Sequence, residues 1–268
     1  MSGMLLQNKN AVVYGGGGAI GGAVARAFAR EGATVFLAGR TQARLDAVAS
    51  DIAADGGAVE TAQIDVFDER AVDEHTAAIA AKAGRIDIAL NAVSVMHDQG
   101  TLLPEISLDE FLRPIDGFLR TLFITSKAVS RHMGGERGGV ILTLSEPGAK
   151  LTIPGILGHG VSAAAKEAFS RLLAAELAPR NIRVVGIRPH AVVDAPSAGS
   201  YTADVFAPAA ASGGQSVQEF VDGLAEGTLL KRLPTLAQIG ETAAFLASDH
   251  AAAMTGTIVD LSAGTLTH

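Results

Sequence analysis

The chain has 268 residues, and 48% of them are hydrophobic, which excludes a disordered chain. Its net charge of −7 argues against a general nucleic-acid binder, because such proteins need a basic face. There is no cysteine for disulfide or thiolate chemistry, and no apolar run approaches the roughly 20 residues that span a bilayer. The N-terminal segment is too short and too polar for a signal peptide, so we expect a cytoplasmic globular protein without a membrane partner.

Short runs of β-branched residues alternate with alanine-rich stretches along almost the whole chain. Helices are expected over 19–32 and 41–56, because each of these stretches closes on a glycine. Capping boxes at Ser107, Ser216 and Thr235 predict three more helix starts. The expected strands are 11–15, 34–39, 59–65, 86–92, 139–145, 182–188 and 255–262. This alternation predicts an α/β fold in which helices cover both faces of a doubly wound parallel sheet, as a single domain over residues 1–268.

A long irregular stretch, 189–214, follows the sixth expected strand. Loops of that length in a compact domain usually cover a site. We therefore expect 189–224 to form a loop and a helix that cover the substrate. The stretch is mostly apolar and has no run of basic residues, which favours a small or medium apolar substrate over a phosphorylated one.

The segment VVYGGGGAIGG lies between the first expected strand and the first expected helix. Gly15 allows a tight turn, the glycines at 16–18 let the backbone approach a pyrophosphate, and Gly21 permits close contact between helix and strand. The N-terminus of the helix adds free N–H groups for the phosphates. This loop predicts dinucleotide binding.

The end of the second expected strand indicates which dinucleotide binds. NAD sites place a carboxylate there for the ribose 2′-hydroxyl, whereas NADP sites place an arginine near the 2′-phosphate. Here Gly39 occupies the place of the acid and Arg40 follows it. A guanidinium pairs with a phosphate that a carboxylate would repel, so the sequence favours NADP(H) over NAD(H).

With these residues in place, the chain resembles the short-chain dehydrogenase/reductase family from its first strand to its C-terminus. The glycine motif of that family appears as Gly15-x-x-x-Ala19-x-Gly21, and Asp65-Val66 matches its adenine-contacting Asp. Residues 232–264 resemble its C-terminal segment, which commonly builds a tetramer interface. The resemblance implies a Rossmann fold, a small-molecule substrate and a homo-oligomer, either a tetramer or a dimer. It also implies cofactor contacts from Gly15, Gly17, Gly18, Ile20, Gly21, Arg40, Asp65, Val66, Asn91, Lys166, Pro189 and Val192.

The catalytic tetrad of the family, Asn, Ser, Tyr and Lys, is kept only in part. Ser145 and Lys166 match its Ser and Lys, while Phe118 stands in the place of its Asn. The Tyr of its Tyr-x-x-x-Lys motif is replaced by Ser162. We expect Lys166 to bind the nicotinamide ribose and Ser145 to donate to an oxyanion. Ser162 holds the tyrosine position, but an aliphatic hydroxyl is a poor proton donor near neutral pH.

Histidine is the better candidate for the proton donor, because its ordinary pKa of about 6.5 lies near neutrality. His159 stands seven residues before Lys166, which resembles the Tyr-x6-Lys spacing of the enoyl reductase branch of the family. The hypothesis is that His159 gives the proton, with His97, His190 or a loop-closing Tyr201 as alternatives. A metal site built from the three histidines is less favoured, because they share no ligand spacing.

Two functions follow. The leading one is an NADP(H)-dependent oxidoreductase that reduces a small or medium apolar carbonyl or enone. The alternative is a dinucleotide-binding protein that has lost turnover and serves as a sensor or scaffold. The missing Asn and Tyr favour the second function, and the retained Ser145 and Lys166 favour the first.

Overall fold

The computed structural model describes residues 4–266, apart from the side chain of Ser212, and its centre is a seven-stranded parallel sheet. The strand order is β3-β2-β1-β4-β5-β6-β7, and every neighbouring pair is parallel. The strands are β1 Asn10–Tyr14, β2 Thr34–Gly39, β3 Val59–Gln63, β4 Ile88–Asn91, β5 Gly139–Leu144, β6 Ile182–Pro189 and β7 Thr257–Leu261. All seven predicted strands are confirmed.

The inner strands, such as β1 and β5, have continuous apolar runs because both faces of the sheet are covered there. Strand β1 shows this directly, since successive side chains of a strand point to opposite faces. Ala11 and Val13 belong to one buried cluster, whereas Val12 and Tyr14 belong to another. The sheet therefore separates two apolar cores.

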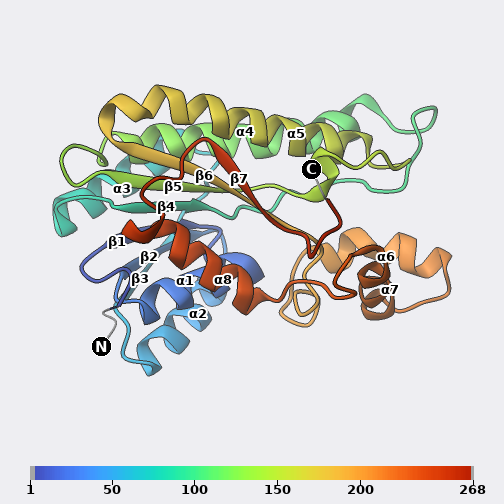
Figure 1. The fold of residues 1–268 in the computed structure, drawn as a ribbon, viewed down its shortest axis with the longest axis horizontal. Helices are drawn as coiled ribbons and strands as arrows, with labels where there is room; N and C mark the ends of the chain where they lie inside the picture. The colour runs from blue at the N-terminus through green and yellow to red at the C-terminus, as the bar shows by residue number, and fades with distance from the viewer. Residues whose placement is uncertain (1–3, 267–268) are drawn as a thin grey trace.

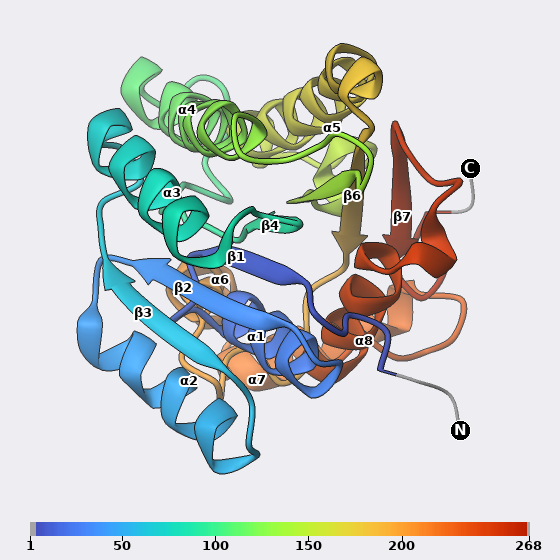
Figure 2. The same cartoon turned by 90° about the vertical axis from the view of Figure 1, so that its left-hand side faces the viewer.

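The helices form one layer on each side of the sheet (Figures 1 and 2). One layer holds α1 Ala19–Arg30, α2 Gln42–Ala54 and α8 Leu236–Ala247. The other holds α3 Glu69–Ala83, α4 Leu108–Ser130 and α5 Leu157–Leu177. This arrangement confirms a doubly wound α/β fold in a single domain.

Local sequence signals set several of the helix ends. The three predicted capping boxes are present at Ser107, Ser216 and Thr235, where each hydroxyl accepts a backbone N–H and the N3 side chain bonds back. Ser216 opens α7 Val217–Gly223, and α4 continues through Pro114. Short 3-10 helices complete the chain: η1 Pro147–Ala149, η2 Ala178–Arg180, η3 Leu224–Gly227 and η4 Asp249–Ala251.

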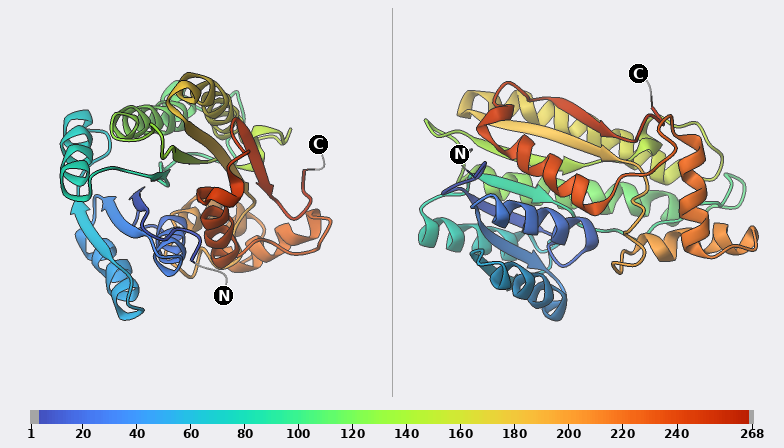
Figure 3. Two further views of the ribbon diagram at one scale, coloured as in Figure 1. Left: turned by 60° about the vertical axis from the view of Figure 1, so that its left-hand side comes forward. Right: turned by 60° about the horizontal axis from the view of Figure 1, so that its bottom comes forward.

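The stretch expected to be irregular, 189–214, is partly helical. Its second half forms α6 Thr202–Ser212, and alanine in TADVFAPAAAS favours this helix despite Pro208. Helices α6 and α7 lie beyond the carboxyl ends of the strands, where they project to one side of the sheet (Figures 1 and 3). Within residues 4–266, no helix has both the length and the apolarity to cross a membrane.

Candidate active site

A cavity of about 590 Å³ lies at the carboxyl ends of the strands, where ligands bind in sheets of this kind. Its floor includes Asn91 from β4, Ser145 after β5 and Pro189 from β6. Of the residues expected to contact a cofactor, the cavity is lined by Gly18, Ile20, Arg40, Asn91, Lys166, Pro189 and Val192. Gly15, Gly17, Gly21, Asp65 and Val66 do not line it.

The glycine loop turns sharply at Gly15, whose φ is +77°, a conformation that favours glycine. A Cβ at Gly15 would lie 2.4 Å from the carbonyl oxygen of Ala92, and a Cβ at Gly21 would lie 2.3 Å from that of Gly15. Gly18 is the N-cap of α1, so the first N–H groups of the helix are left for a ligand. The tight turn and the close approach expected of these glycines are therefore present.

Two arginines stand beside the outer part of the cavity. Arg40 follows β2 and Arg44 lies in the first turn of α2, and both side chains are exposed and line the cavity. Sequence reasoning identified Arg40 and missed Arg44. Arg44 could have been found from the sequence, because it lies four residues after Arg40, in the first turn of the next expected helix.

Hydrogen bonds orient two further predicted polar contacts, Asp65 and Asn91. Asp65 is exposed, and its Oδ1 accepts the N–H of Phe67 at 3.0 Å. Asn91 is buried; its Nδ2 donates to Oγ1 of Thr125 at 3.0 Å, and its Oδ1 accepts the N–H of Val93 at 3.1 Å. These bonds orient Asn91 at the end of β4.

Lys166 is buried in α5, with only 3% of its surface exposed. Its Nζ lies 2.6 Å from Oε1 of Glu146 and 4.1 Å from the centroid of the Phe118 ring. The aromatic face of Phe118 therefore contacts the lysine ammonium in a cation–π arrangement. The carboxylate and the ring together fix the position of Lys166.

Ser145 is tied to a buried ionic network. Its Oγ donates to Oε1 of Glu167 at 2.9 Å, and Glu167 pairs with Arg188 through bonds of 2.7 and 2.9 Å. Arg188 also binds Asp260 of β7 at 3.0 Å, and its hydrogen bond to Glu167 is the main cause of its raised pKa. The network holds Ser145 in one orientation, and sequence reasoning missed all three of its charged members.

Ser162 lies away from the cavity. It is fully buried in α5, and its hydroxyl donates to the carbonyl oxygen of His159 at 2.8 Å, inside its own helix. A serine that bonds back to its helix has its proton engaged locally. A chemical role for Ser162 stays a prediction without support from its position.

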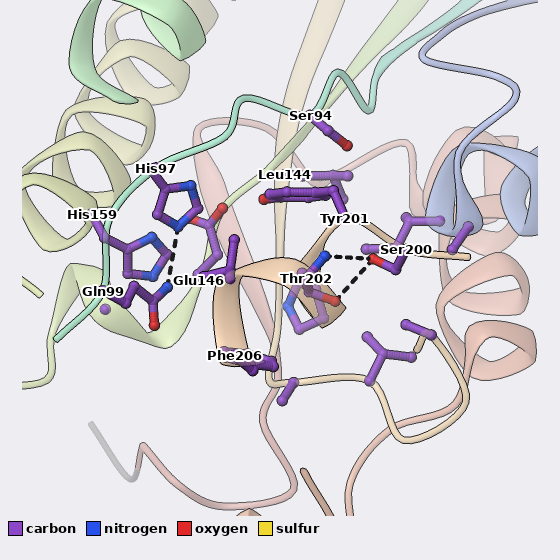
Figure 4. Close-up of a pocket in the computed structure, with 18 of the residues that line it drawn as sticks. Ser94, His97, Gln99, Leu144, Glu146, His159, Ser200, Tyr201, Thr202 and Phe206 are labelled. Carbon is purple, nitrogen blue, oxygen red and sulfur yellow. Dashed lines mark hydrogen bonds between the residues drawn. The ribbon is translucent and has the colours of Figure 1, made fainter. Parts of the chain in front are cut away.

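His97 and His159 meet face to face in the cavity wall, with ring centroids 4.8 Å apart and planes 7° from parallel (Figure 4). Nδ1 of His97 lies 2.8 Å from the carbonyl oxygen of Val95, and its Nε2 lies 3.1 Å from the amide nitrogen of Gln99. The carbonyl requires a donor and the amide requires an acceptor, so His97 is neutral with its proton on Nδ1.

Burial lowers the pKa of both stacked histidines. For His159 the pKa falls to about 4, mainly because of burial, which the charge of Glu146 only partly offsets. Burial is also the main cause of the lowered pKa of His97. His190 lines the cavity as well; its Nδ1 accepts the N–H of Ala191 at 2.6 Å, and burial lowers its pKa.

Tyr201 already lies in the cavity and needs no loop closure to reach it. Its ring meets His97 edge-on, with centroids 6.0 Å apart (Figure 4). Burial raises the pKa of this phenol, and the charge of Glu146 raises it further. Tyr201 is therefore a protonated hydroxyl near the histidine pair.

Sequence reasoning missed Glu146, which directly follows Ser145 and lines the cavity. The sequence could have indicated Glu146 as a site residue, because it is a charged residue immediately after a buried strand. As for metals, the region from residue 4 to 266 contains no group of three or more His, Asp or Glu side chains that could hold an ion.

Comparisons with known proteins agree with this geometry. Residues 17–265 match the family model described as Enoyl-(Acyl carrier protein) reductase. An uncharacterized oxidoreductase from Methylorubrum extorquens is 32% identical over 260 residues, which cover 97% of this chain and 98% of that protein. A 3-oxoacyl-(acyl-carrier-protein) reductase from Chlamydia pneumoniae is 32% identical over 184 residues, or 69% of this chain and 73% of that protein.

Solved structures are similar over nearly the whole chain. A dehydrogenase/reductase from Sinorhizobium meliloti has a TM-score of 0.83 at 26% identity, over 98% of this chain and 97% of that one. A short-chain dehydrogenase/reductase from Serratia marcescens has a TM-score of 0.82 at 26% identity, over 97% and 99%. The chain therefore belongs to the short-chain dehydrogenase/reductase family and is an oxidoreductase.

Proposed function

We propose that this protein is an NADP(H)-dependent oxidoreductase that reduces a small or medium apolar carbonyl or enone. The observation that supports it best is the continuity of the cavity. One end is lined by Gly18 and Arg40, and the same cavity reaches Lys166. Its remaining wall carries apolar side chains from the segment that covers it.

The residues present fit a nicotinamide dinucleotide. The loop leaves no room for a Cβ at Gly15 or Gly21, and the open N-terminus of α1 suits a pyrophosphate. Arg40 and Arg44 supply positive charge for a 2′-phosphate, and Asn91, Pro189 and Val192 line the inner part of the cavity. When bound, this cofactor would supply or accept a hydride.

Three side chains would serve the carbonyl group of the substrate. Lys166 would hold the nicotinamide ribose and bring positive charge to the site. Ser145 would donate its hydroxyl to the developing oxyanion once that hydroxyl turns away from Oε1 of Glu167, its partner in the ligand-free site. His159 would move the proton, because it lines the cavity beside Glu146 and Lys166. Ser162 has no role in the proposed reaction.

The substrate chamber is apolar. Its walls include Leu151 and Ile153 from the segment before α5, and Val205, Phe206 and Phe220 from α6 and α7. Pockets of this character favour apolar ligands, and the few polar groups orient them. The segment 189–224 would thus cover the substrate, as proposed from its sequence.

The relatives favour turnover over a sensor or scaffold. They are named as oxidoreductases, and the Chlamydia pneumoniae relative is named for reduction of a 3-oxoacyl group, a carbonyl substrate. A reductase acting on a carbonyl flanked by an apolar chain fits the chamber described above. A cytoplasmic location stays a prediction from the sequence.

The test begins with NADPH binding, followed by fluorescence, and continues with a carbonyl and enone panel followed by NADPH absorbance. We expect the wild type to bind NADPH and oxidise it with at least one panel member. Lys166→Ala should lower kcat/KM by about 100-fold, since it removes a charge next to the reacting centre. His159→Ala should lower kcat by a similar factor if it moves the proton.

Binding of NADPH without turnover on any member would favour the sensor instead. Activity that His159→Ala leaves untouched would remove this residue from the reaction. Arg171→Ala, an exposed substitution on α5, is the matched control and should leave both measurements unchanged.

A further inference from the structure

Glu146 is a carboxylate in the wall of the cavity, and the proposed function assigns it no role. It follows Ser145 at the end of β5, and its side chain is 26% exposed in the wall of the cavity. Figure 4 shows it beside the two stacked imidazole rings. Glu146 therefore lies next to Ser145, to Lys166 and to the stacked pair of His97 and His159.

Two polar atoms at this point of the site have unused hydrogen-bonding capacity. Oε1 of Glu146 binds Nζ of Lys166 at 2.6 Å, but Oε2 is buried without a hydrogen-bond partner among the described residues. Nδ1 of His159 is also buried and, in that same part of the chain, has none. Buried polar atoms are nearly always bonded in native proteins, so an unused pair in a cavity wall indicates a ligand or a proton in transit.

The charges around Glu146 keep it in its basic form. It is faced by Lys166 and His159 from α5, by His97 from the segment after β4, and by Tyr201 ahead of α6. Burial alone would raise the pKa of Glu146, but nearby positive charge, chiefly that of Lys166, outweighs burial, and the net pKa lies below its ordinary value. At neutral pH the group is a carboxylate beside neutral imidazoles.

We propose that Glu146 is the acid–base residue of this site, in place of the tyrosine that the family has at the position of Ser162, with His159 as its proton relay. This inference rests on the proposed function and deepens it. Its geometric basis is the carboxylate bonded to Lys166 inside the cavity and the unused oxygen and nitrogen that accompany it.

The reaction balances in both directions. In alcohol oxidation, the O–H bond breaks and its proton passes to the carboxylate of Glu146. The C–H bond would break with both electrons, for which a bound oxidised dinucleotide would supply the hydride acceptor, so the alcohol would become a carbonyl. The protonated Glu146 then releases its proton through neutral His159 to water. Carbonyl reduction is the same sequence reversed.

The charge states favour one direction at neutral pH. A carboxylate and a neutral imidazole both accept protons, so the ligand-free site is prepared to remove a proton from an alcohol. We therefore expect a substrate pair that includes a secondary or primary alcohol, and oxidation of the alcohol that does not need alkaline pH.

The test compares the wild type with Glu146→Gln, which keeps the size of the side chain but cannot accept a proton at neutral pH. Glu146→Asp is the conservative variant, and Glu136→Gln, an exposed loop substitution, is the matched control. NADPH affinity is measured by fluorescence, and kcat is measured in both directions, with panel alcohols plus NADP and panel carbonyls plus NADPH.

In Glu146→Gln we expect kcat to fall by about 100-fold or more. The NADPH affinity should be unchanged or tighter, because Lys166 is released from its carboxylate partner. Wild-type alcohol oxidation should show no acid limb above about pH 6, since Glu146 loses its basic form only below its lowered pKa. Glu146→Asp should recover part of kcat, and Glu136→Gln should behave as the wild type.

Other results would overturn the inference. If Glu146→Gln and the wild type share one kcat and one pH profile, Glu146 moves no proton, although the proposed oxidoreductase stands. If kcat and NADPH affinity fall together with the melting temperature, and Glu146→Asp recovers neither, the role of Glu146 is structural. A wild type that binds NADPH but turns over no alcohol or carbonyl contradicts the proposed function and this inference with it.

Discussion

Two side chains from outside α5 fix the position of Lys166. The ring of Phe118, from α4, contacts the ammonium of Lys166. Glu146 adds an ion pair to the same ammonium, so the ring and the carboxylate together hold the lysine in place.

Arg40 provides a test at this scale. Arg40→Ala removes a guanidinium that would form charge-assisted bonds with a 2′-phosphate, each worth about 1.5–3 kcal/mol. We therefore expect NADPH affinity to fall about 10-fold or more, whereas NADH affinity should stay the same. Fluorescence titration with both dinucleotides measures this. Tighter binding of NADH by the wild type, or equal losses for both dinucleotides, would contradict the assignment to NADP.

At the scale of elements, the contact between the glycine loop and α1 leaves no free space. The carbonyl oxygen of Gly15 lies 2.3 Å from the position of a Cβ on Gly21, and the obstacle is backbone, which cannot rotate away as a side chain can. The loop and the helix are therefore one rigid unit that presents its N–H groups together.

Gly21→Ala should displace this loop. We expect NADPH affinity to fall at least 10-fold, and the free energy of unfolding to fall by about 1–3 kcal/mol, the usual cost of overpacking. Fluorescence titration and thermal unfolding measure the two effects. Gly223→Ala is the control, because a Cβ at Gly223 meets no heavy atom within 4 Å. An unchanged affinity in Gly21→Ala would show that the loop does not hold the dinucleotide.

At the scale of the whole molecule, the outer surfaces of α4 and α5 carry exposed apolar side chains. Leu108 is 70% exposed, Phe123 54% and Leu172 68%. Exposed apolar groups on neighbouring helices are typical of an interaction surface. They support the homo-oligomer that the resemblance of the sequence implies.

We predict that light scattering after size exclusion gives a mass of two or four times the 27.3 kDa of one chain. Leu172→Glu combined with Phe123→Glu should lower that mass, because charges placed in an apolar contact lose hydration without gaining partners. Lys150→Glu, an exposed change outside these helices, serves as the control. A wild type that elutes as a monomer would refute the oligomer.

The sequence by itself determined the fold and the location of the site. Strand and helix signals are local: apolar runs, capping boxes such as Ser107 with Glu110, and glycine at Gly15 and Gly21 where a Cβ has no room. The order of these signals specifies a parallel sheet, and the carboxyl ends of its strands specify where a ligand binds. Arg40, Ser145 and Lys166 were found because family spacing along the chain identifies them.

Only the tertiary structure decided the chemistry inside the site. The distances from Glu146 to Lys166 and from His97 to His159 join residues 20 and 62 positions apart, and no local pattern predicts such contacts. Burial likewise depends on the packing of the complete molecule, and burial is what lowers the pKa of His159 and raises that of Tyr201. Proton affinity is a property of the surroundings of a group, and the fold creates those surroundings from distant parts of the chain.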